Sequence, residues 1–375
     1  MNTLEQLLAA KLEERSSAGN LRRLTTIAQP VDFFSNDYLG LSKTGLLSKL
    51  MAETYTDAGG TGSTGSRLLS GNSTETHTLE QAIAGFHKAE AALLFNSGYD
   101  ANLGLMASLG QKHTTILYDE LCHASIIDGV RLAITPNKYK YYHNDIADLS
   151  EKLERHSGKG PVIVITESVF SMDGDTAHLE LIAALCHAHN AQLIVDEAHA
   201  TGVFGERGEG LVCALGLQEQ VFARVHTYGK AMGCHGAAVV GSRLLQQYLV
   251  NFARPFIYTT ALPQHSVRVI QCAYNYLSSP QYDPAVLHDL IALFRQQAQE
   301  KGISGLIDSI SPIQAIVVPG NAAAAKMAER AQAAGMQVKA ILSPTVPAGQ
   351  ERLRICLHSY NTEAQVGALL SAIAG

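Results

Sequence analysis

The stretch that decides the fold is Asp196-Glu197-Ala198-His199 together with His226-Thr227-Tyr228-Gly229-Lys230. Each of the two pieces follows a short apolar run that is typical of a buried strand. In an open α/β sheet, ligands bind beyond the carboxyl ends of the strands. An acid, an imidazole and a lysine at two such ends therefore predict a ligand site. A lone Asp-x-x-His would more often cap a turn, so the flanking sequence has to support this interpretation.

The sequence around this stretch alternates β-rich runs with helical segments, which is the pattern of βαβ units in a mostly parallel sheet. We expect strands at residues 92–96, 115–118, 162–166, 192–196, 224–227 and 237–241. Helices are expected between them, notably at 78–88 and 179–189. After about residue 264 longer helices such as 285–299 follow, with strands at 315–318, 337–341 and 353–357. These patterns predict an α/β fold followed by a smaller C-terminal α+β domain.

The predicted domains are an N-terminal helix and arm (1–45), a large α/β domain (46–265) and a small α+β domain (266–375). Residues 1–16 are expected to form a charged amphipathic helix, and they lack the apolar core of a signal peptide. No apolar run approaches the ~18 residues of a membrane span. We therefore expect a protein that does not enter a membrane.

Charge and cysteine content exclude further classes. The net charge of −6 and the pI near 6.2 argue against a nucleic-acid surface. The six cysteines are scattered without a C-x-x-C pair, so neither a disulfide framework nor a zinc site is indicated, and a cytoplasmic location fits best. The charged fraction of 17% is below the average of about 25%, which weakly favours a surface covered by a partner subunit.

Polar residues gather at four predicted strand ends. Besides the two ends already quoted, Asn96-Ser97-Gly98-Tyr99 follows one strand and Glu167-Ser168-Val169-Phe170-Ser171-Met172-Asp173-Gly174 follows another. Gly98 opens a predicted helix at 99–109, so backbone N–H groups there can bind an anion. The hydroxyl of Thr227 can reach the same anion, although a threonine that ends a strand often reflects β-propensity alone.

The residue types at these ends suit one cofactor chemistry. Pyridoxal phosphate needs a lysine that carries its aldehyde as a Schiff base and a carboxylate that keeps the pyridine nitrogen protonated. Lys230 and Asp196 provide such a pair. His123, after the strand at 115–118, offers a flat ring that could cover one face of the cofactor, although a lone histidine is more often structural. His187 and His189 do not share a helix face, so we expect no metal there.

The glycine-rich segment 59–72 does not follow a strand, so it is neither a dinucleotide fingerprint nor a phosphate-binding P-loop. We interpret it as a mobile or closely packed loop near a ligand.

Taken in order, the motifs resemble those of the pyridoxal phosphate-dependent α-oxoamine synthases. The resemblance spans about residues 20–360 and rests on Ser35-Asn36-Asp37-Tyr38-Leu39-Gly40-Leu41, Gly65-Ser66-Arg67, Asn96-Ser97-Gly98-Tyr99, His123-Ala124-Ser125, Glu167 to Asp175, Asp196 to Gly202, Thr227 to Lys230 and Pro344-Thr345-Val346-Pro347. It implies the fold of type I pyridoxal phosphate-dependent transferases, which is aspartate aminotransferase-like, and a homodimer.

The resemblance also implies a role for each matching residue at the cofactor. Lys230 would form the Schiff base and remove the Cα proton, and Asp196 would pair with the pyridine nitrogen. His199 and Ser171 would face the phenolate oxygen, and His123 would stack on the ring. The phosphate would be held by Gly98, Tyr99 and Thr227, with Thr260 reaching over from a second subunit.

On the substrate side, the resemblance implies that Arg354 grips the amino-acid carboxylate with Asn36 nearby. Arg22 and Thr345 would contact an acyl thioester. The segment 344–354 most resembles the members that condense L-alanine with a pimeloyl thioester in biotin synthesis. Whether CoA or acyl carrier protein carries the acyl group stays open.

Several alternatives keep the cofactor and change the substrate: glycine C-acetyltransferase, 5-aminolevulinate synthase, serine palmitoyltransferase and autoinducer synthase. An aminotransferase would share the fold and the Asp/Lys pair. One segment and one residue depart from the family pattern. The segment 23–33 has little of the small strand that members often carry there, and His235 has no assigned role.

Overall fold

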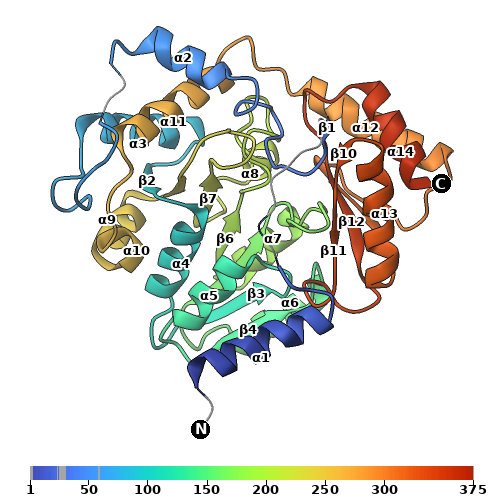
Figure 1. The fold of residues 1–375 in the computed structure, drawn as a ribbon. Coiled ribbons are helices and arrows are strands. Elements are labelled where there is room, and N and C mark those ends of the chain that lie inside the picture. The colour runs from blue at the N-terminus through green and yellow to red at the C-terminus, as the bar shows by residue number, and fades with distance from the viewer. Residues whose placement is uncertain (1–2, 23, 25–30, 58–59, 375) are drawn as a thin grey trace.

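The computed structural model describes residues 3–22, 24, 31–57 and 60–374. At its centre lies a seven-stranded sheet with the order β2-β8-β7-β6-β5-β3-β4 (Figure 1). Its strands are β2 (Ala91–Phe95), β3 (Thr115–Asp119), β4 (Lys138–Tyr141), β5 (Val162–Glu167), β6 (Gln192–Asp196), β7 (Ala223–Thr227) and β8 (Ala237–Gly241). Strand β8 runs antiparallel to both neighbours, and the pairs from β7 to β4 are parallel. The predicted mostly parallel α/β sheet is confirmed.

The sequence prediction missed β4, whose residues Lys138-Tyr139-Lys140-Tyr141 contain no apolar run. This strand lies at the edge of the sheet and leaves Tyr139 and Lys140 exposed. An edge strand needs no hydrophobic partner on its open side, and charged residues there hinder pairing with other chains. The hydrophobic pattern used to find the other strands is therefore missing.

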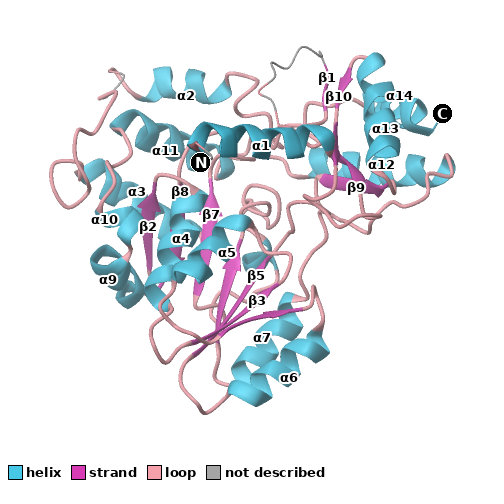
Figure 2. Cartoon of the chain, turned by 60° about the horizontal axis from the view of Figure 1, so that its bottom comes forward, coloured by secondary structure: helices cyan, strands magenta, loops and turns pink. Residues whose placement is uncertain are grey.

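Helices cover both faces of this sheet (Figure 2). The helices are α1 (Leu4–Ser17), α2 (Leu46–Thr54), α3 (Thr74–Phe86), α4 (Gly98–Leu109), α5 (Ala124–Leu132), α6 (Ile146–His156), α7 (Leu179–Ala188), α8 (Leu211–Ala214), α9 (Arg243–Phe252), α10 (Arg254–Ile257), α11 (Gln264–Leu277), α12 (Ala285–Glu300), α13 (Asn321–Ala333) and α14 (Glu363–Ala374). Because side chains alternate along each strand, the sheet contributes to two cores. Ile165 and Ile194 pack with α4 and α5, whereas Val164 and Val195 belong to the core with α3, α7 and α11.

A second sheet lies near the C-terminus, at the right of Figure 1. Its strands have the order β11-β12-β9 and are antiparallel: β9 (Ile313–Val317), β11 (Lys339–Ile341) and β12 (Arg352–Cys356). Helix α13 contacts β11 and β12, and α14 contacts α12 and α13. These elements agree with the expected α+β character of this region, while the domain boundaries at 45 and 265 stay a prediction.

The N-terminal arm joins the C-terminal part through a two-stranded parallel sheet. Strand β1 (Val31–Asp32) pairs with β10 (Met336–Gln337). The strand expected at 337–341 is thus divided between β10 and β11, which belong to different sheets. The segment 23–33 does contribute a short strand at its end, although residues 23 and 25–30 lie outside the described residues.

Within residues 3–22, 24, 31–57 and 60–374, no helix is long and apolar enough to cross a membrane. The same ranges hold no group of three or more His, Cys, Asp or Glu side chains placed to bind a metal ion.

Candidate active site

A cavity of about 260 Å³ opens where β5, β6 and β7 end and α4 begins. Eight of the predicted site residues line it: Asn36, Gly98, Tyr99, His123, Asp196, His199, Thr227 and Lys230. The parallel strands bring them together because their carboxyl ends lie at one edge of the sheet. The register places Glu167 of β5 directly beside Asp196 of β6. His235, which had no predicted role, lines the same cavity and is exposed.

Asp196 is 4% exposed and is held at both carboxylate oxygens. Its Oδ2 accepts a hydrogen bond from Asn102 Nδ2 at 2.7 Å, and its Oδ1 accepts from the backbone N–H of Ala198 at 2.9 Å. A buried carboxylate needs such donors to stay charged. Asp196 is therefore a fixed negative group on the wall of the cavity.

Lys230 follows β7 on the same wall and is only partly exposed. Burial lowers the pKa of its ammonium group, because removal from water disfavours the charged form. The carboxylates of Asp196 and Glu167 act in the opposite direction, and Arg354 adds to the lowering. The Lys230 side chain is thus closer to a neutral, nucleophilic amine than an exposed lysine is.

His123 caps the start of α5, and its ring is oriented by Ser125. The backbone N–H of Ser125 donates to His123 Nδ1 at 3.2 Å, and the Ser125 hydroxyl lies 2.8 Å from the same nitrogen. Since Nδ1 accepts, the neutral ring carries its hydrogen on Nε2. Asn102 Nδ2 also donates to Ser125 Oγ at 3.0 Å, so one amide positions both Asp196 and the support of His123.

His199 is linked to Arg354 through two intervening side chains. The hydroxyl of Tyr38 lies 2.7 Å from His199 Nδ1 and 3.1 Å from Asn36 Oδ1. The same Asn36 oxygen accepts from Arg354 Nη2 at 3.1 Å. Burial, together with Lys230 and Arg354, keeps the pKa of His199 well below its ordinary value, so the ring is neutral. A phenol has one hydrogen, so while Tyr38 donates to Asn36 Oδ1, the Nδ1–H of His199 donates to Tyr38. If the Tyr38 hydroxyl turns to Nδ1 instead, the hydrogen of the neutral ring lies on Nε2, which can then donate to an acceptor.

The opposite end of the cavity suits a phosphate. Gly98 and Tyr99 open α4, where backbone N–H groups lack helical acceptors and the helix dipole favours an anion. Thr227 is buried, and its Oγ1 has no hydrogen-bond partner within the described part of the chain. A Cβ on Gly98 would lie 2.4 Å from Thr227 Cγ2, so only glycine leaves this space open. An anion bridging α4 and Thr227 would satisfy the orphaned hydroxyl, and these residues therefore fit a phosphate.

Glu167 is a further buried acid on the wall, and the sequence analysis gave it no role. It accepts a hydrogen bond from the backbone N–H of His123. Burial raises the pKa of Glu167 well above its ordinary value, and the neighbouring Asp196 raises it further. Glu167 therefore binds a proton more readily than an exposed glutamate, while Asp196 lies beside it with two donors of its own.

The remaining predicted residues lie outside the cavity lining. The Ser171 carbonyl accepts from Arg354 Nε at 2.7 Å, so this pair adjoins the cavity through Asn36. The Thr260 carbonyl accepts from Asn96 Nδ2 at 2.8 Å, and its side chain is exposed. Arg22 and Thr345 are both exposed and lie on loops. The single chain thus unites most of the predicted cofactor residues, but leaves Ser171, Thr260 and the predicted acyl-binding residues Arg22 and Thr345 outside the lining.

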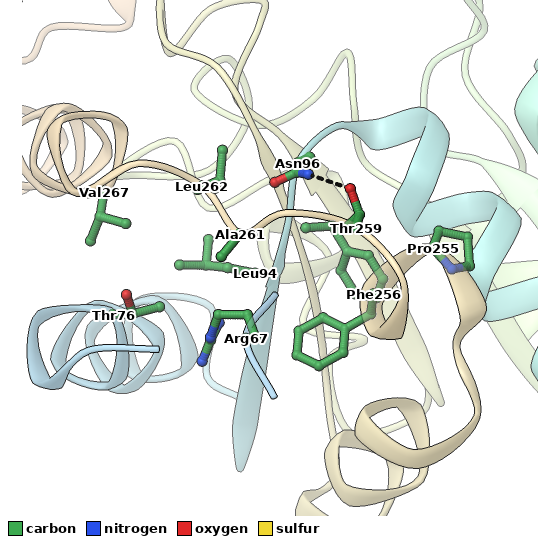
Figure 3. A pocket seen from close by; sticks show the side chains of 11 residues that line it. Arg67, Thr76, Leu94, Asn96, Pro255, Phe256, Thr259, Ala261, Leu262 and Val267 are labelled. Atoms are coloured by element: carbon green, nitrogen blue, oxygen red, sulfur yellow. Dashed lines mark hydrogen bonds between the residues drawn. The ribbon is translucent and has the colours of Figure 1, made fainter. Parts of the chain in front are cut away.

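The glycine-rich segment packs against the chain near Thr260. The backbone N–H of Ala261 donates to the Gly65 carbonyl at 2.9 Å, and Ser63 Oγ donates to the Leu262 carbonyl at 2.6 Å. Figure 3 shows the small cavity beneath it, about 20 Å³, with Arg67 facing Phe256. The segment from residue 60 onward is thus bonded to residues 261–262 through Ser63 and Gly65, while Leu68 and Leu69 are exposed. Residue 59 lies outside the described residues, and the mobile or closely packed loop near a ligand stays a prediction.

Four residues that shape the site were given no role from the sequence. Tyr38, Ser125 and Glu167 lie within motifs that were quoted, so their position beside functional residues could have identified them. Asn102 is a polar residue on the buried side of α4, only 2% exposed. A buried amide in an otherwise apolar helix core is a signal that sequence periodicity can detect.

Comparisons with known proteins identify the family of this chain. The model of the family "Aminotransferase class I and II" matches residues 28–373. The chain is 40% identical over 370 residues to an 8-amino-7-oxononanoate synthase from Chromohalobacter salexigens, covering 98% of this chain and 95% of the relative.

Two solved structures are also similar. One is a serine palmitoyltransferase from S. paucimobilis with a bound PLP–myriocin aldimine (TM-score 0.89, 26% identity, covering 100% of this chain and 98% of that one). The other is an 8-amino-7-oxononanoate synthase from Francisella tularensis (TM-score 0.76, 30% identity, covering 92% and 96%). With its α-oxoamine synthase motifs in order, this chain belongs to the aminotransferase class I and II family.

Proposed function

We propose that the chain binds pyridoxal 5'-phosphate through Lys230 and condenses L-alanine with a pimeloyl thioester. The products are 8-amino-7-oxononanoate, CO2 and the free thiol, which is a step of biotin synthesis. The observation that carries this proposal is the convergence of Lys230, Asp196, His123 and His199 on one cavity. The names of relatives at 40% identity supply the substrates.

When bound, the cofactor supplies an electron sink, which accepts the electron pair that remains on the amino-acid Cα when a bond to that carbon breaks. Asp196, fixed by Asn102 and Ala198, would hold a proton on the pyridine nitrogen through a charge-assisted bond. His199 Nε2 would donate to the phenolate oxygen once the Tyr38 hydroxyl turns from Asn36 Oδ1 to His199 Nδ1. His123 would cover one face of the ring and exclude water from it.

Lys230 has a second task as a base. Its lowered pKa favours a neutral amine, which can take the proton from the Cα of the amino acid. The new bond then forms between this Cα and the thioester carbonyl carbon, and the thiol leaves. The leaving sulfur takes up a proton from water. The bond from Cα to the carboxylate then breaks with release of CO2, and the Cα recovers the proton that Lys230 had taken, which completes the balance.

Arg354 is positioned to bind the amino-acid carboxylate. Its Nε, Nη1 and Nη2 donate to the Ser171 carbonyl, Cys356 Sγ and Asn36 Oδ1. A guanidinium group has five N–H donors, so two remain for a carboxylate in the bidentate arrangement that arginine favours. The three existing bonds fix the direction in which these two donors point.

The test is a turnover assay on purified protein with a panel of amino acids and thioesters, following release of free thiol. Alanine with pimeloyl-CoA should have the highest kcat/KM. Serine palmitoyltransferase is the second candidate, because such structures superpose with TM-scores up to 0.91. Faster turnover of serine with palmitoyl-CoA would therefore replace the proposed activity, and repeating the assay with pimeloyl-acyl carrier protein would identify the carrier.

We further propose a homodimer in the cytoplasm, in which Thr260 of one subunit reaches the phosphate of the other. The exposure of Thr260 and the backbone bond from Ala261 to Gly65 in the loop behind it support this arrangement. Each of the six cysteines is free, as suits a reducing compartment. Light scattering at micromolar concentration should give twice the mass of the chain, and a fully active monomer would contradict the proposal.

A further inference from the structure

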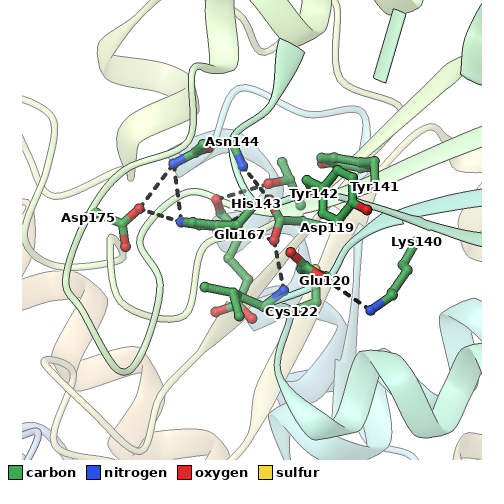
Figure 4. A network of polar contacts seen from close by, with 12 residues as sticks. Asp119, Glu120, Cys122, Lys140, Tyr141, Tyr142, His143, Asn144, Glu167 and Asp175 are labelled. Atoms are coloured by element: carbon green, nitrogen blue, oxygen red, sulfur yellow. Dashed lines mark hydrogen bonds and ion pairs between the residues drawn. The ribbon is translucent and has the colours of Figure 1, made fainter. Parts of the chain in front are cut away.

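His143 lies outside the cavity and joins two carboxylates, one at the end of β3 and one in the loop after β5 (Figure 4). Its Nδ1 is 3.0 Å from Asp119 Oδ1 and 3.1 Å from Asp119 Oδ2. Its Nε2 is 2.8 Å from Asp175 Oδ2. The ring of Phe170 packs edge-on against the imidazole at 4.4 Å. The ring of His143 is thus fixed on three sides.

The contacts of His143 define its charge. A carboxylate only accepts hydrogen bonds, so a ring with a carboxylate at each nitrogen has to carry hydrogen on both. Burial lowers the pKa of this imidazole, but its bonds to Asp119 and Asp175 outweigh that effect and raise the pKa to about 9. Asp119 and Asp175 are the charged groups that face the ring.

Asp119 shapes the loop that carries His123. It is completely buried at the end of β3, and its Oδ1 accepts from the backbone N–H of Leu121 at 2.9 Å. Its backbone carbonyl accepts from the N–H of Cys122 at 3.1 Å. These bonds close the turn that leads directly into His123. The position of the Asp119 side chain therefore helps to set the position of the start of α5.

Asp175 belongs to a hairpin at residues 168–177, which also carries Ser171. The hairpin is closed by a bond from the Phe170 N–H to the Asp175 carbonyl at 2.9 Å. Asn144 adds two bonds from its Nδ2, to Asp175 Oδ2 at 3.0 Å and to the Thr176 carbonyl at 3.1 Å. The dipeptide His143-Asn144 thus anchors one side of the hairpin.

The other side of the hairpin contacts the C-terminal sheet. Asp173 forms an ion pair with Arg352 of β12, and the Gly174 carbonyl accepts from Ser309 Oγ at 2.7 Å. Two residues after Arg352, Arg354 donates its Nε to the Ser171 carbonyl. The hairpin therefore sets the distance between the large sheet and the arginine expected to bind the substrate carboxylate.

We propose that His143 is a positioning residue of the active site: by bridging Asp119 and Asp175 it fixes the 168–177 hairpin, and with it Ser171 and Arg354, relative to His123. This inference rests on the proposed function for the identity of the amino acid, but the geometry that carries it does not depend on the acyl substrate. His143 acts through its neighbours and does not line the cavity.

The test compares holoenzyme variants His143→Gln, Asp175→Asn and the double variant. Glutamine keeps a hydrogen-bond donor but removes the charge, and asparagine breaks the bridge on the hairpin side only. His156→Gln is the matched control, since this histidine, at the end of α6, stacks on Tyr139 of β4. Binding of glycine, L-alanine and L-serine is followed through the absorbance of the cofactor, without any thioester, and pyridoxal phosphate affinity is measured by dialysis.

We expect His143→Gln to weaken binding of the preferred amino acid by about tenfold, as for loss of a charge-assisted hydrogen bond. Asp175→Asn should do the same, and the double variant should be no worse than His143→Gln, because both act through one bridge. Asp175→Glu should recover part of the binding, and His156→Gln should bind as the wild type does.

A purely structural role would lower the melting temperature while leaving amino-acid and cofactor affinities of the folded protein within about twofold, and this result would overturn the proposal. Additive effects in the double variant would also overturn it. If His143→Gln does not fold, the Asp175→Asn and Asp175→Glu pair decides alone. Since no acyl substrate is used, a wild type inactive with pimeloyl-CoA would refute the proposed function and leave this comparison intact.

Discussion

The cofactor end and the acyl end of the proposed site are built differently. At the cofactor end, Asp196 and His199 are each 4% exposed and are held by hydrogen bonds from neighbouring elements. At the acyl end, Arg22 and Thr345 are exposed and lie on loops. Groups fixed on strands act without reorganisation, whereas loops tolerate sequence change. The difference indicates that the chemistry is fixed by the sheet and that the acyl specificity is set by the loops.

The largest expected effect is at Lys230. Lys230→Ala should lower kcat by at least about 10³-fold, because both the covalent attachment and the base are lost. Borohydride treatment of the wild type, followed by peptide mass analysis, should find the cofactor on the peptide that contains Lys230. Lys49→Ala, on the exposed face of α2, is the control. Labelling at another lysine would contradict the assignment.

The next effect is at Asp196. Asp196→Asn keeps the shape of the side chain and removes its charge, so the pyridine nitrogen loses its proton. We expect kcat to fall about 10²-fold, on the order of 3 kcal/mol of barrier, with the fold retained by circular dichroism. Asp148→Asn, which breaks the ion pair to Lys152 on α6, serves as the control. Near-normal turnover of Asp196→Asn would refute the proposal that Asp196 keeps the pyridine nitrogen protonated.

Arg354 lies where the two ends meet, and its effect should be on substrate binding. Arg354→Lys removes the bonds to Ser171 and Asn36 and the bidentate geometry. We expect KM for the amino acid to rise by about tenfold to hundredfold, with a smaller fall in kcat. Arg330→Lys on α13 is the matched control. An unchanged KM would move carboxylate recognition to another residue.

The contribution of His143 to the stability of the folded protein should also depend on pH. The pKa of His143 is raised from 6.5 to about 9 in the folded protein by Asp119 and Asp175 against the effect of burial. Its stabilising contribution is therefore fully present below about pH 6.5 and is lost as pH rises towards 9. The difference in melting temperature between wild type and His143→Gln should shrink over that range, and a constant difference would be inconsistent with a charged bridge.

The smallest effects are expected at the acyl end. Arg22→Ala should raise KM for pimeloyl-CoA by about tenfold, and Thr345→Val by only about twofold to fivefold, because exposed contacts are screened by water. KM for the amino acid should not change in either variant. A loss of activity as large as that of Asp196→Asn would show that the acyl end is as tightly built as the cofactor end. The proposed difference between the two ends would then be wrong.

The sequence predicted the elements that bury apolar runs and missed those that do not. Strands β5 to β8 were located to within a residue or so, since their core residues leave a clear pattern. Strand β4, with two of its four residues exposed, and the break at Val338, where the chain passes from one sheet to another, were missed because neither has a distinct hydrophobic period. Tertiary pairing, which sequence patterns do not encode directly, decides such elements.

The candidate site was predictable to a similar degree. Residues at strand ends, such as Asp196 and Lys230, could be found because the sheet places them together. The contacts that orient them could not be predicted, even where the residue itself gave a signal: Asn102 reaches Asp196 from another element, and Tyr38 reaches His199 across 161 positions in the sequence. Such partners depend on how helices and arms pack on the sheet. The resemblance to a family identified the side chains expected to contact the cofactor and the substrate. The structure was needed to find the residues that orient these side chains.

The hydrogen bonds of Arg354 have a consequence for synthesis of the chain. The bond to Ser171 spans 183 positions and the bond to Asn36 spans 318, so Arg354, the arginine proposed to bind the substrate, is absent from the nascent protein until late in translation. The residues that line the cavity, by contrast, are all present once β8 has left the ribosome. Because domains fold as they emerge, the growing chain can assemble a cofactor pocket before it can accept an amino acid. The order of translation thus separates cofactor capture from the onset of catalysis.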